Sequence, residues 1–180
     1  MQIKIISYNL NDYFVAVTIE LINLRYMYNN NRKIQIIGEV VMEKTLVLIK
    51  PDAIERKLMG EIISVYERNN FNITDMKLIR PTVEIAERHY HEHVNKPFFN
   101  ELINYITKGN VCALVIEGDS VIEKVRKING ATDPRNAEPE TIRGKYALSK
   151  QENCVHGSDS KESAEREIII WFDKIKEGIK

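Results

Sequence analysis

Cysteine is scarce: the chain has two, Cys112 and Cys154, and they are not spaced as a CxxC pair. Two isolated cysteines indicate neither a disulfide framework nor a cysteine-based metal motif, so we expect reduced thiols in a cytoplasmic protein. An excess of either charge is also lacking, because 26 basic side chains balance 26 acidic ones. Neutral bulk charge argues against a nucleic-acid-binding protein, and no nucleic acid partner is expected.

Long hydrophobic runs are missing as well. No apolar run reaches the roughly 18–20 residues of a transmembrane helix, so no membrane partner is expected. Glu20 and Arg25 interrupt the apolar stretch from Tyr13 to Tyr28, and no small-residue cleavage site follows it, so we predict no signal peptide. The chain lacks GxxxxGK[ST], GxGxxG and the HRD and DFG elements, which excludes a P-loop kinase and a protein kinase fold.

The first 41 residues differ in composition from the rest. They hold four of the eight tyrosines, one glycine and no proline. Met42 stands just before the first clear strand. We interpret residues 1–41 either as a translated leader, with Met42 as the true start, or as a real extension that supplies a strand pair or an oligomer contact. The domain itself is expected to span residues 42–180.

Beyond Met42, apolar patterning predicts an alternation of strands and helices. The expected strands are residues 45–49, 71–79, 111–116 and a short last strand at 146–148. The expected helices are residues 60–70, a helix capped by Thr82, a helix from Pro97 to Gly109, and residues 120–128 and 160–172. This order predicts an α/β (α+β) fold: a ferredoxin-like βαββαβ sandwich with a four-stranded antiparallel sheet and added helices.

One segment, Asn153-Cys-Val-His-Gly-Ser-Asp-Ser160, places a histidine just before an acidic helix. Gly157 is expected to let the backbone approach the imidazole of His156 closely. Glu167 lies seven residues after Ser160, and its side chain tilts back toward the helix N-terminus. A carboxylate bound to one ring nitrogen leaves the other nitrogen free as a nucleophile. Taken alone, a loop histidine bonded to nearby backbone is the more common finding.

Cationic side chains surround an irregular stretch at residues 129–145. Arg126, Thr132 and Arg143 can bind phosphate oxygens if they converge, because guanidinium groups match phosphate bidentately. A solvated loop with structural arginines is the alternative. Lys50 follows a buried strand, where the sites of α/β sheets gather, and can reach a substrate hydroxyl or phosphate; a simple strand-ending turn is the alternative.

A third set of residues lies between the second strand and the third. His89 and His93 have the i, i+4 spacing of a metal pair, but no third ligand is evident and zinc is not expected. An exposed Phe98 can stack on a base. The alternative is that Phe98 and Phe99 both belong to the core.

From Met42 to Phe172 the chain resembles the nucleoside diphosphate kinases. The motifs that carry this resemblance are Thr45-Leu-Val-Leu-Ile-Lys-Pro-Asp52, Arg88-His-Tyr90, Lys96-Pro-Phe-Phe99, Gly130-Ala-Thr-Asp-Pro134, Thr141-Ile-Arg-Gly144, Asn153 with His156-Gly-Ser-Asp-Ser160, and Glu162-Ser-Ala-Glu165. Seven motifs in the same order and with matching gaps make the resemblance specific, and together they outweigh the alternatives given for each motif alone.

The resemblance implies an enzyme that transfers the γ-phosphate of a nucleoside triphosphate, mainly ATP, to a nucleoside diphosphate, and so supplies CTP, GTP and UTP. It implies a ping-pong mechanism through phosphorylated His156, with Glu167 orienting the histidine and Ser158 assisting. Mg2+ is the expected cofactor, carried by the nucleotide rather than by protein side chains. A homo-oligomer, a tetramer or a hexamer, is expected.

The same resemblance assigns the nucleotide-binding residues. Arg126, Thr132 and Arg143 would clamp the phosphates, with Tyr90 beside the transferred phosphate and His93 near the inner ones. The remaining assignments are to the sugar and the base: Lys50 and Asn153 would hold the sugar hydroxyls, and Phe98 would stack on the base.

Three single residues depart from the family pattern, and the segment Lys150-Gln151-Glu152 keeps the family spacing but is more polar than usual. Glu140 replaces a common glycine, Lys145 replaces a common acidic residue, and Cys154 occupies an aliphatic position. None removes a catalytic group. Two other readings stay open: a non-catalytic nucleotide-binding member of the family, which the presence of His156 disfavours, and a nucleic-acid-binding regulator, which the neutral charge disfavours.

Overall fold

The computed structural model describes residues 3–9, 14–19, 24–28, 34–39 and 42–172. The chain divides into two units, Met1–Met42 and Glu43–Lys180. The first unit has the strands β1 (Ile3–Asn9), β2 (Phe14–Ile19), β3 (Leu24–Tyr28) and β4 (Ile34–Glu39). They pair antiparallel with their neighbours in chain order. The extension thus holds a four-stranded meander, where the sequence led us to consider a strand pair.

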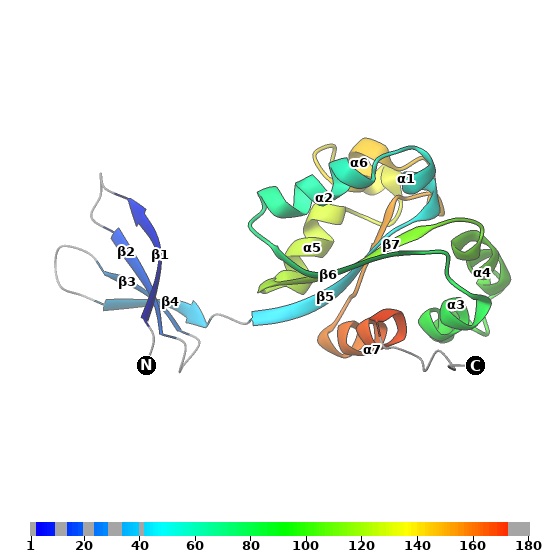
Figure 1. Ribbon diagram of the computed structural model, residues 1–180. Helices are drawn as coiled ribbons and strands as arrows, with labels where there is room; N and C mark the ends of the chain where they lie inside the picture. Colours follow the sequence, from blue (N-terminus) through cyan, green and yellow to red (C-terminus); the bar gives the residue numbers. More distant parts are fainter. Residues whose placement is uncertain (1–2, 10–13, 20–23, 29–33, 40–41, 173–180) are drawn as a thin grey trace. The chain divides into compact units, whose positions relative to one another are not determined.

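The rest of the chain alternates strands and helices (Figure 1). Its strands are β5 (Met42–Ile49), β6 (Asn72–Ile79), β7 (Val111–Asp119) and β8 (Val155–Gly157). Its helices are α1 (Pro51–Glu55), α2 (Met59–Arg68), α3 (Val83–His89), α4 (Phe99–Thr107), α5 (Val121–Asn129), α6 (Ile142–Tyr146) and α7 (Lys161–Phe172), with 3-10 turns η1 (His91–His93) and η2 (Pro134–Asn136).

The four strands of this unit form one sheet in the order β6-β7-β5-β8. Strand β6 pairs antiparallel with β7, and β8 pairs antiparallel with β5. Helices α1, α2, α5 and α6 cover one face of the sheet, and α3, α4 and α7 cover the other (Figure 1). The predicted ferredoxin-like sandwich with added helices is confirmed.

The sheet is buried on both faces because the side chains of its central strands alternate between two apolar layers. Along β5, Val47 and Ile49 pack in the layer of α1, α2 and α5. Leu46 and Leu48 pack in the layer of α3, α4 and α7, against Trp171. A strand buried on both faces reads as a continuous apolar run, which is how residues 45–49 read in the sequence.

Capping residues and prolines in the sequence predicted the starts of helices α3 and α4 to within two residues. The hydroxyl of Thr82 accepts a hydrogen bond from the backbone N–H of Ile85 (3.2 Å), so Thr82 caps α3 as predicted. Helix α4 was expected to begin at Pro97 and begins two residues later, at Phe99.

The predicted last strand at residues 146–148 is wrong. Tyr146 ends α6, and Leu148 is 63% exposed. The hydroxyl of Thr141 accepts from the N–H of Gly144 (3.1 Å) and caps that helix, so the segment turns instead of extending. The sheet is completed by β8, three residues long and centred on His156.

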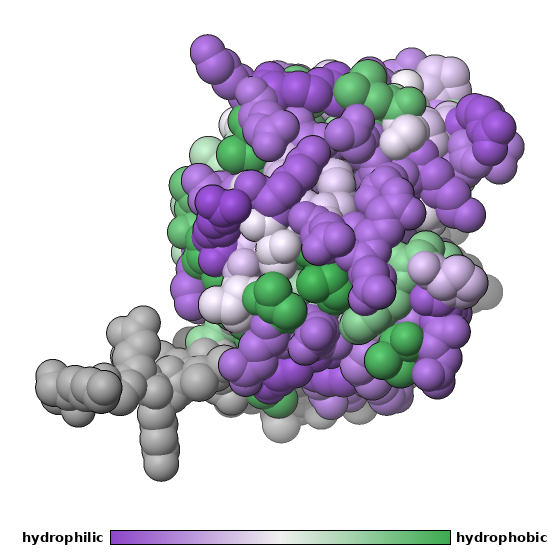
Figure 2. Space-filling view, turned by 90° about the vertical axis from the view of Figure 1, so that its right-hand side faces the viewer, coloured by the Kyte–Doolittle hydropathy of each residue, from purple (hydrophilic) through white to green (hydrophobic). Residues whose placement is uncertain are grey.

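Within the described ranges, no helix combines the length and the apolar character needed to cross a membrane. The face of the molecule in Figure 2 is mostly hydrophilic, and its apolar residues lie in small separate groups. Scattered apolar residues of this kind are ordinary on a protein surface.

Candidate functional site

His156 occupies the middle of β8, opposite Leu48 of β5. Two residues earlier, Cys154 has a left-handed backbone conformation with φ +66°. The N–H of Cys154 donates to Oδ2 of Asp52 (3.1 Å), and its carbonyl accepts from the N–H of Lys50 (2.8 Å). These bonds stabilise the turn into β8 on the N-terminal side of His156, and on the other side the N–H of Ser158 donates to the carbonyl of Leu46 (3.1 Å).

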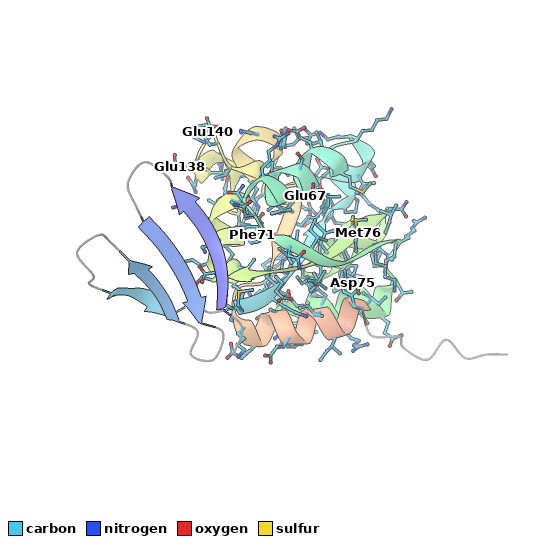
Figure 3. The ribbon with its side chains drawn as sticks, turned by 60° about the vertical axis from the view of Figure 1, so that its left-hand side comes forward. Glu67, Phe71, Asp75, Met76, Glu138 and Glu140 are labelled. Atoms are coloured by element: carbon cyan, nitrogen blue, oxygen red, sulfur yellow. The ribbon has the colours of Figure 1, made fainter. Side chains whose placement is uncertain are left out.

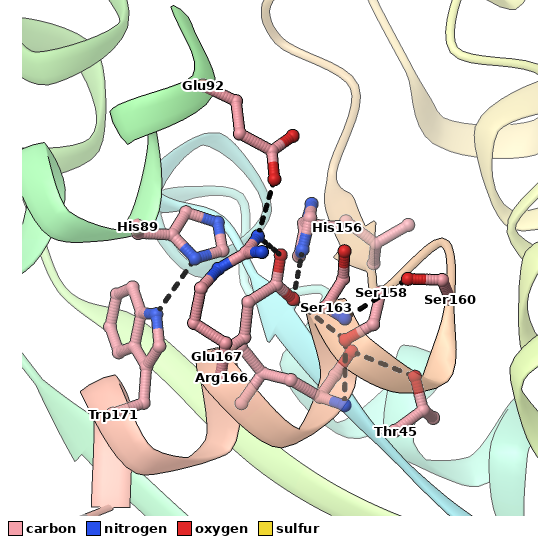
Figure 4. Close-up of polar contacts among 12 residues, drawn as sticks. Thr45, His89, Glu92, His156, Ser158, Ser160, Ser163, Arg166, Glu167 and Trp171 are labelled. Carbon is pink, nitrogen blue, oxygen red and sulfur yellow. Dashed lines mark hydrogen bonds and ion pairs between the residues drawn. The ribbon is translucent and has the colours of Figure 1, made fainter. Parts of the chain in front are cut away.

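Glu167 of α7 contacts the imidazole of His156 directly (Figure 4). Nε2 of His156 lies 2.9 Å from Oε2 of Glu167, and the side chain of Glu167 is only 6% exposed. A carboxylate can only accept, so the imidazole carries its proton on Nε2. Nδ1 keeps its lone pair and can act as a nucleophile, and the His156 side chain, 25% exposed, lines the pocket.

Ser158 holds the carboxylate of Glu167 in place. Its hydroxyl donates to Oε2 of Glu167 (2.7 Å) and accepts from the backbone N–H of Leu46 (3.2 Å). Burial alone would raise the pKa of Glu167, but the bonds from His156 and Ser158 and the nearby imidazoles lower it to about 2. Glu167 is therefore an anion at neutral pH.

His89, which the sequence did not single out for this site, packs against His156. The two ring centroids are 4.6 Å apart and the rings are nearly perpendicular. Trp171 Nε1 donates to Nδ1 of His89 (3.3 Å), so His89 carries its own proton on Nε2. Burial, followed by the neighbouring His156, lowers the pKa of His89 to about 3, so this ring is neutral at physiological pH.

Arg143 is held by backbone. Its Nη1 donates to the carbonyl of Gly130 (2.5 Å) and its Nη2 to that of Val155 (2.8 Å). Its Nε is buried and has no hydrogen-bond partner among the described residues. Burial lowers the pKa of Arg143. Arg126 and Thr132 are exposed and line the same pocket, so the three residues expected at phosphates do converge.

Lys50 and Asn153 form a buried pair. Nζ of Lys50 donates to Oδ1 of Asn153 (2.7 Å), and Nδ2 of Asn153 donates to the carbonyls of Thr132 (3.0 Å) and Lys150 (2.9 Å). Burial, with a contribution from Arg143, lowers the pKa of Lys50 to about 8. The strand-end lysine predicted from the sequence is thus joined to the loop that precedes β8.

The segment between α3 and α4 presents aromatic side chains to the pocket. Tyr90 and His93 stack with centroids 6.3 Å apart, and His93 meets Phe98 edge-on at 5.8 Å. Phe98 is 44% exposed, whereas Phe99 packs against the core of α3, α4 and α7. Helix α3 ends at His89, so His89 and His93 do not share one helix face and the i, i+4 spacing of a metal pair does not apply.

A pocket of about 680 Å³ unites these groups. Of the site residues predicted from the sequence, all but Ser158 line this pocket: Lys50, Tyr90, His93, Phe98, Arg126, Thr132, Arg143, Asn153, His156 and Glu167. Ser158 contacts the site through its hydrogen bond to Glu167. The pocket also includes residues that the sequence did not indicate as site residues, among them His89, Glu92, Asn129 and Arg166.

The reason for a glycine at position 157 differs from our expectation. A Cβ there would lie 2.9 Å from Nδ2 of Asn129 and 3.2 Å from a methyl group of Val125. The close approach that needs a glycine is therefore to helix α5, not to the imidazole of His156.

Two of the departures from the family pattern are neighbours. Nζ of Lys145 lies 3.3 Å from Oε2 of Glu140. The Glu140 side chain is 91% exposed, so this ion pair sits in solvent and contributes little to stability. Cys154, the third departure, is buried beneath β8 as a free thiol.

Potential metal ligands also meet in the pocket. One ligand atom each from His89, His156 and Glu167 lies within 4.8 Å of the other two. Nδ1 of His89 already accepts from Trp171, and Oε2 of Glu167 accepts from both His156 and Ser158. Nδ1 of His89, Nε2 of His156 and Oε2 of Glu167 are thus engaged in hydrogen bonds without an ion.

Comparisons with known proteins by sequence and by structure identify the same family. Residues 43–176 match the family model of the nucleoside diphosphate kinases. The nucleoside diphosphate kinase of Clostridium perfringens (strain 13 / Type A) is 54% identical over 134 residues, 74% of this chain and 94% of the relative. That of Saccharolobus islandicus (strain L.S.2.15 / Lassen #1) is 51% identical over 135 residues, 75% of this chain and 98% of the relative. A crystal structure of the Aquifex aeolicus nucleoside diphosphate kinase superposes with a TM-score of 0.72 at 39% identity, covering 74% of this chain and 97% of that one.

Proposed function

The chain belongs to the nucleoside diphosphate kinase family, and from this premise we propose a role for each group of residues in its pocket. The protein is a phosphotransferase that moves the γ-phosphate of a nucleoside triphosphate to a nucleoside diphosphate. The reaction is a ping-pong exchange with a phosphohistidine between its two half-reactions. Its substrates are nucleotides, and ATP is the proposed main donor.

His156 is the proposed nucleophile, and its hydrogen bond to Glu167 is the observation that carries the proposal. The lone pair of Nδ1 attacks the γ-phosphorus, and the bond to the bridging oxygen breaks, leaving its electron pair on the departing diphosphate. The imidazole gains positive character during attack, and the anionic Glu167 stabilises it. Ser158 acts through Glu167 as a positioning residue.

The phosphates are the proposed ligands of Arg126, Thr132 and Arg143, which line one side of the pocket. Arg143 is pre-organised because two backbone carbonyls fix its guanidinium, and each terminal nitrogen keeps a second N–H that can donate to a phosphate oxygen. Fixed cations stabilise charge that develops in a transition state without reorganising at the moment of reaction. Tyr90 and His93 line the same pocket, and we propose that Tyr90 contacts the transferred phosphate and His93 the inner phosphates.

The sugar and the base are assigned to the two remaining parts of the pocket. Lys50 and Asn153 would bind the ribose hydroxyls, supported by their 2.7 Å contact at the floor of the site. Phe98, 44% exposed and at the pocket, would stack on the base. Stacking does not depend on the hydrogen-bonding edge of a base, so the exchange would accept all common bases.

Members of the family use a divalent cation, and Mg2+ is the one we propose. Mg2+ prefers oxygen ligands and usually keeps phosphate and water ligands. Glu167 is engaged by His156 and Ser158, and Glu92 by Arg166, so these carboxylates form no oxygen cage. The two imidazoles and one carboxylate of the His89 group suit a softer metal such as zinc. The pocket therefore fits a magnesium ion that arrives on the nucleotide phosphates, where it supplies charge neutralisation.

A homo-oligomer, a tetramer or hexamer built from dimers, is also proposed. Strand β6 is at one edge of its sheet and has β7 as its neighbour there. Met76, labelled in Figure 3 with its neighbour Asp75, is 58% exposed on this strand, and Leu78 is 54% exposed. In an antiparallel pair of β6 strands centred on Met76, each Asp75 would lie opposite a Lys77, and opposite charges across strands stabilise such pairs.

Residues 42–180 are proposed as the catalytic domain and residues 1–41 as an extension to it. The boundary of the two units falls between Met42 and Glu43, and the family match begins at residue 43. The cytoplasm is the proposed location, because Cys112 and Cys154 are both free thiols.

Labelling with γ-32P-ATP tests the function. In the absence of an acceptor, we expect an acid-labile, alkali-stable label that leaves when a nucleoside diphosphate is added. His156→Gln should abolish the label, whereas His91→Gln, an exposed histidine of η1 outside the pocket, should keep it. A stable label on the His156→Gln protein would remove His156 as the nucleophile.

A further inference from the structure

Arg166 lies beside the nucleophile and has no role in the reaction described above. It precedes Glu167 on α7 and lines the pocket. Its Nη2 lies 3.0 Å from Oε1 of Glu92 in η1 and 3.9 Å from Oε1 of Glu167. In Figure 4 the guanidinium sits between these two carboxylates, on the His89 side of the His156 imidazole.

The contacts of Arg166 are weaker than those of Arg143. Each terminal nitrogen of Arg143 donates one hydrogen bond to a backbone carbonyl. Arg166 is paired with a side chain that is 51% exposed, and its buried Nε has no hydrogen-bond partner among the described residues. An ion pair between partly exposed side chains is readily exchanged for another anion, because solvent screens it.

Phosphorylation adds such an anion within the same pocket. A phosphoryl group on Nδ1 of His156 brings close to two negative charges and three acceptor oxygens. Glu167, on the opposite ring nitrogen, is already an anion. Two anions bound to one imidazole need a nearby cation, and Arg166 is within 3.9 Å of one of them.

We propose that Arg166 binds the phosphoryl group carried by His156, and that Glu92 competes with this group for the same guanidinium. The proposal rests on His156 being the phosphorylated residue. In the free enzyme Glu92 holds Arg166. When Nδ1 bonds to the γ-phosphorus and the diphosphate leaves with the electron pair of the broken P–O bond, Arg166 moves from Glu92 to the new phosphoryl oxygens. Glu92 thereby limits the stability of the phosphoenzyme, which must give up its phosphate in the second half-reaction.

Competition between Glu92 and the phosphoryl group predicts opposite effects of two substitutions on the phosphoenzyme, whereas a purely structural ion pair does not. Glu92→Gln and Arg166→Gln break the same ion pair between η1 and α7. If the pair only held these two elements together, the two variants would change the phosphoenzyme in the same direction. If Glu92 competes with the phosphoryl group, Glu92→Gln stabilises the phosphoenzyme and Arg166→Gln destabilises it.

The measurement is the equilibrium constant of the first half-reaction, [E-P][ADP]/[E][ATP], obtained by incubating the full-length protein with labelled ATP and Mg2+ at fixed ATP:ADP ratios. We expect Arg166→Gln to lower it by roughly tenfold or more, as for a lost charged hydrogen bond. Glu92→Gln should raise it by about two- to fivefold, the range of an exposed ion pair. The double variant should match Arg166→Gln, because without the guanidinium of Arg166 there is no cation for which Glu92 and the phosphoryl group compete.

Glu101→Gln is the matched control, since it removes another exposed carboxylate from the same pocket. It should leave the constant unchanged, which separates competition from the general field of the pocket. Arg166→Lys, which keeps the charge, covers the case that Arg166→Gln fails to fold. An unchanged constant in Glu92→Gln, or a shift in the same direction for both single Gln variants, overturns the proposal. Absence of any phosphoenzyme in the unaltered protein would instead overturn the proposed function.

Discussion

Glu167 binds His156 from a different element of the fold: its Oε2 lies 2.9 Å from Nε2, although 11 residues separate the two in the chain. Strand β8 carries the imidazole and helix α7 carries the carboxylate. The contact selects which ring nitrogen is protonated, and so which nitrogen can attack phosphorus. The nucleophile is therefore defined by how α7 packs on the sheet.

Glu167→Gln should lower kcat by about 10- to 100-fold, the cost of one lost charged hydrogen bond. An amide is uncharged and does not enforce the same tautomer of His156. KM for nucleotides should change little, because Glu167 contacts the imidazole rather than the nucleotide. Steady-state kinetics check this, with Glu165→Gln as the control on an exposed turn of the same helix. A Glu167→Gln enzyme with unaltered kcat would contradict the orienting role.

Arg143→Ala should lower kcat/KM by about 10²–10³, as for a lost charge-stabilising donor. It should also destabilise the fold by about 1–3 kcal/mol, because the carbonyls of Gly130 and Val155 lose their donor. Arg143→Lys keeps the charge but not the planar fork, so we expect an intermediate kcat/KM. Urea unfolding together with kinetics separates the two effects. Loss of stability with unchanged kcat/KM would make Arg143 purely structural.

His89 should make stability depend on pH. Its pKa is about 3 in the folded protein and near 6.5 in the unfolded chain, so the unfolded state binds the proton first. The contribution of His89 is complete above about pH 6.5 and is lost as the pH falls toward 3. When the pH is lowered from 7.5 to 5.0, protonation of His89 in the unfolded chain should reduce the free energy of unfolding by about 2 kcal/mol.

Urea titrations of the unaltered protein and of His89→Gln at those two pH values measure this contribution. The glutamine oxygen can still accept from Trp171, but it does not titrate. The drop in stability should therefore be smaller in His89→Gln by about 2 kcal/mol. Equal drops in both proteins would show that His89 is not held in its neutral form.

Met76→Asp should weaken self-association. A carboxylate at the centre of two antiparallel β6 strands would meet its own copy, and like charges directly opposite each other repel. Sedimentation velocity should show smaller species at the same protein concentration. Val83→Asp is the control, because Val83 is 54% exposed on α3 and is not part of β6. Unchanged association in Met76→Asp would exclude the β6 edge as the interface.

A protein that starts at Met42 should retain kcat/KM within about twofold. The family match and the second unit both begin at residue 43, and every residue of the pocket lies beyond it. Both proteins should be compared in the same exchange assay from ATP to a nucleoside diphosphate. A large loss of activity in the shorter protein would show that residues 1–41 take part in catalysis.

The fold followed from the sequence where local rules decide the structure. Residues 45–49 read as a strand because both faces are buried, and Thr82 caps α3 with its own hydroxyl. The last strand was misplaced because β8 has three residues, too few for any alternation to be visible. Its position depends on pairing with β5, more than 100 residues earlier: Leu46 N–H bonds Ser158 Oγ across 112 residues.

The site residues, like the strands and helices, could be predicted from the sequence only where a motif identifies them. Motif resemblance placed Lys50, Arg143 and His156 in one site, and the structure brings them together. His89 and Arg166 were not identified as site residues, because no spacing rule says which way a side chain faces once α3 and α7 pack on the sheet. Arg166 lies next to Glu167 in sequence, but only the position of Glu92 shows that it faces the pocket.

The buried contacts of Ser158 with Leu46 and of Lys50 with Asn153 close loops of 112 and 103 residues. Contacts so distant along the chain form slowly, because closing these long loops lowers the chain entropy before the new contacts stabilise the domain. Partly folded forms with native helices would therefore lack a competent nucleophile. Regain of phosphotransfer during renaturation is consequently a marker of the completed domain, later than any signal from secondary structure alone.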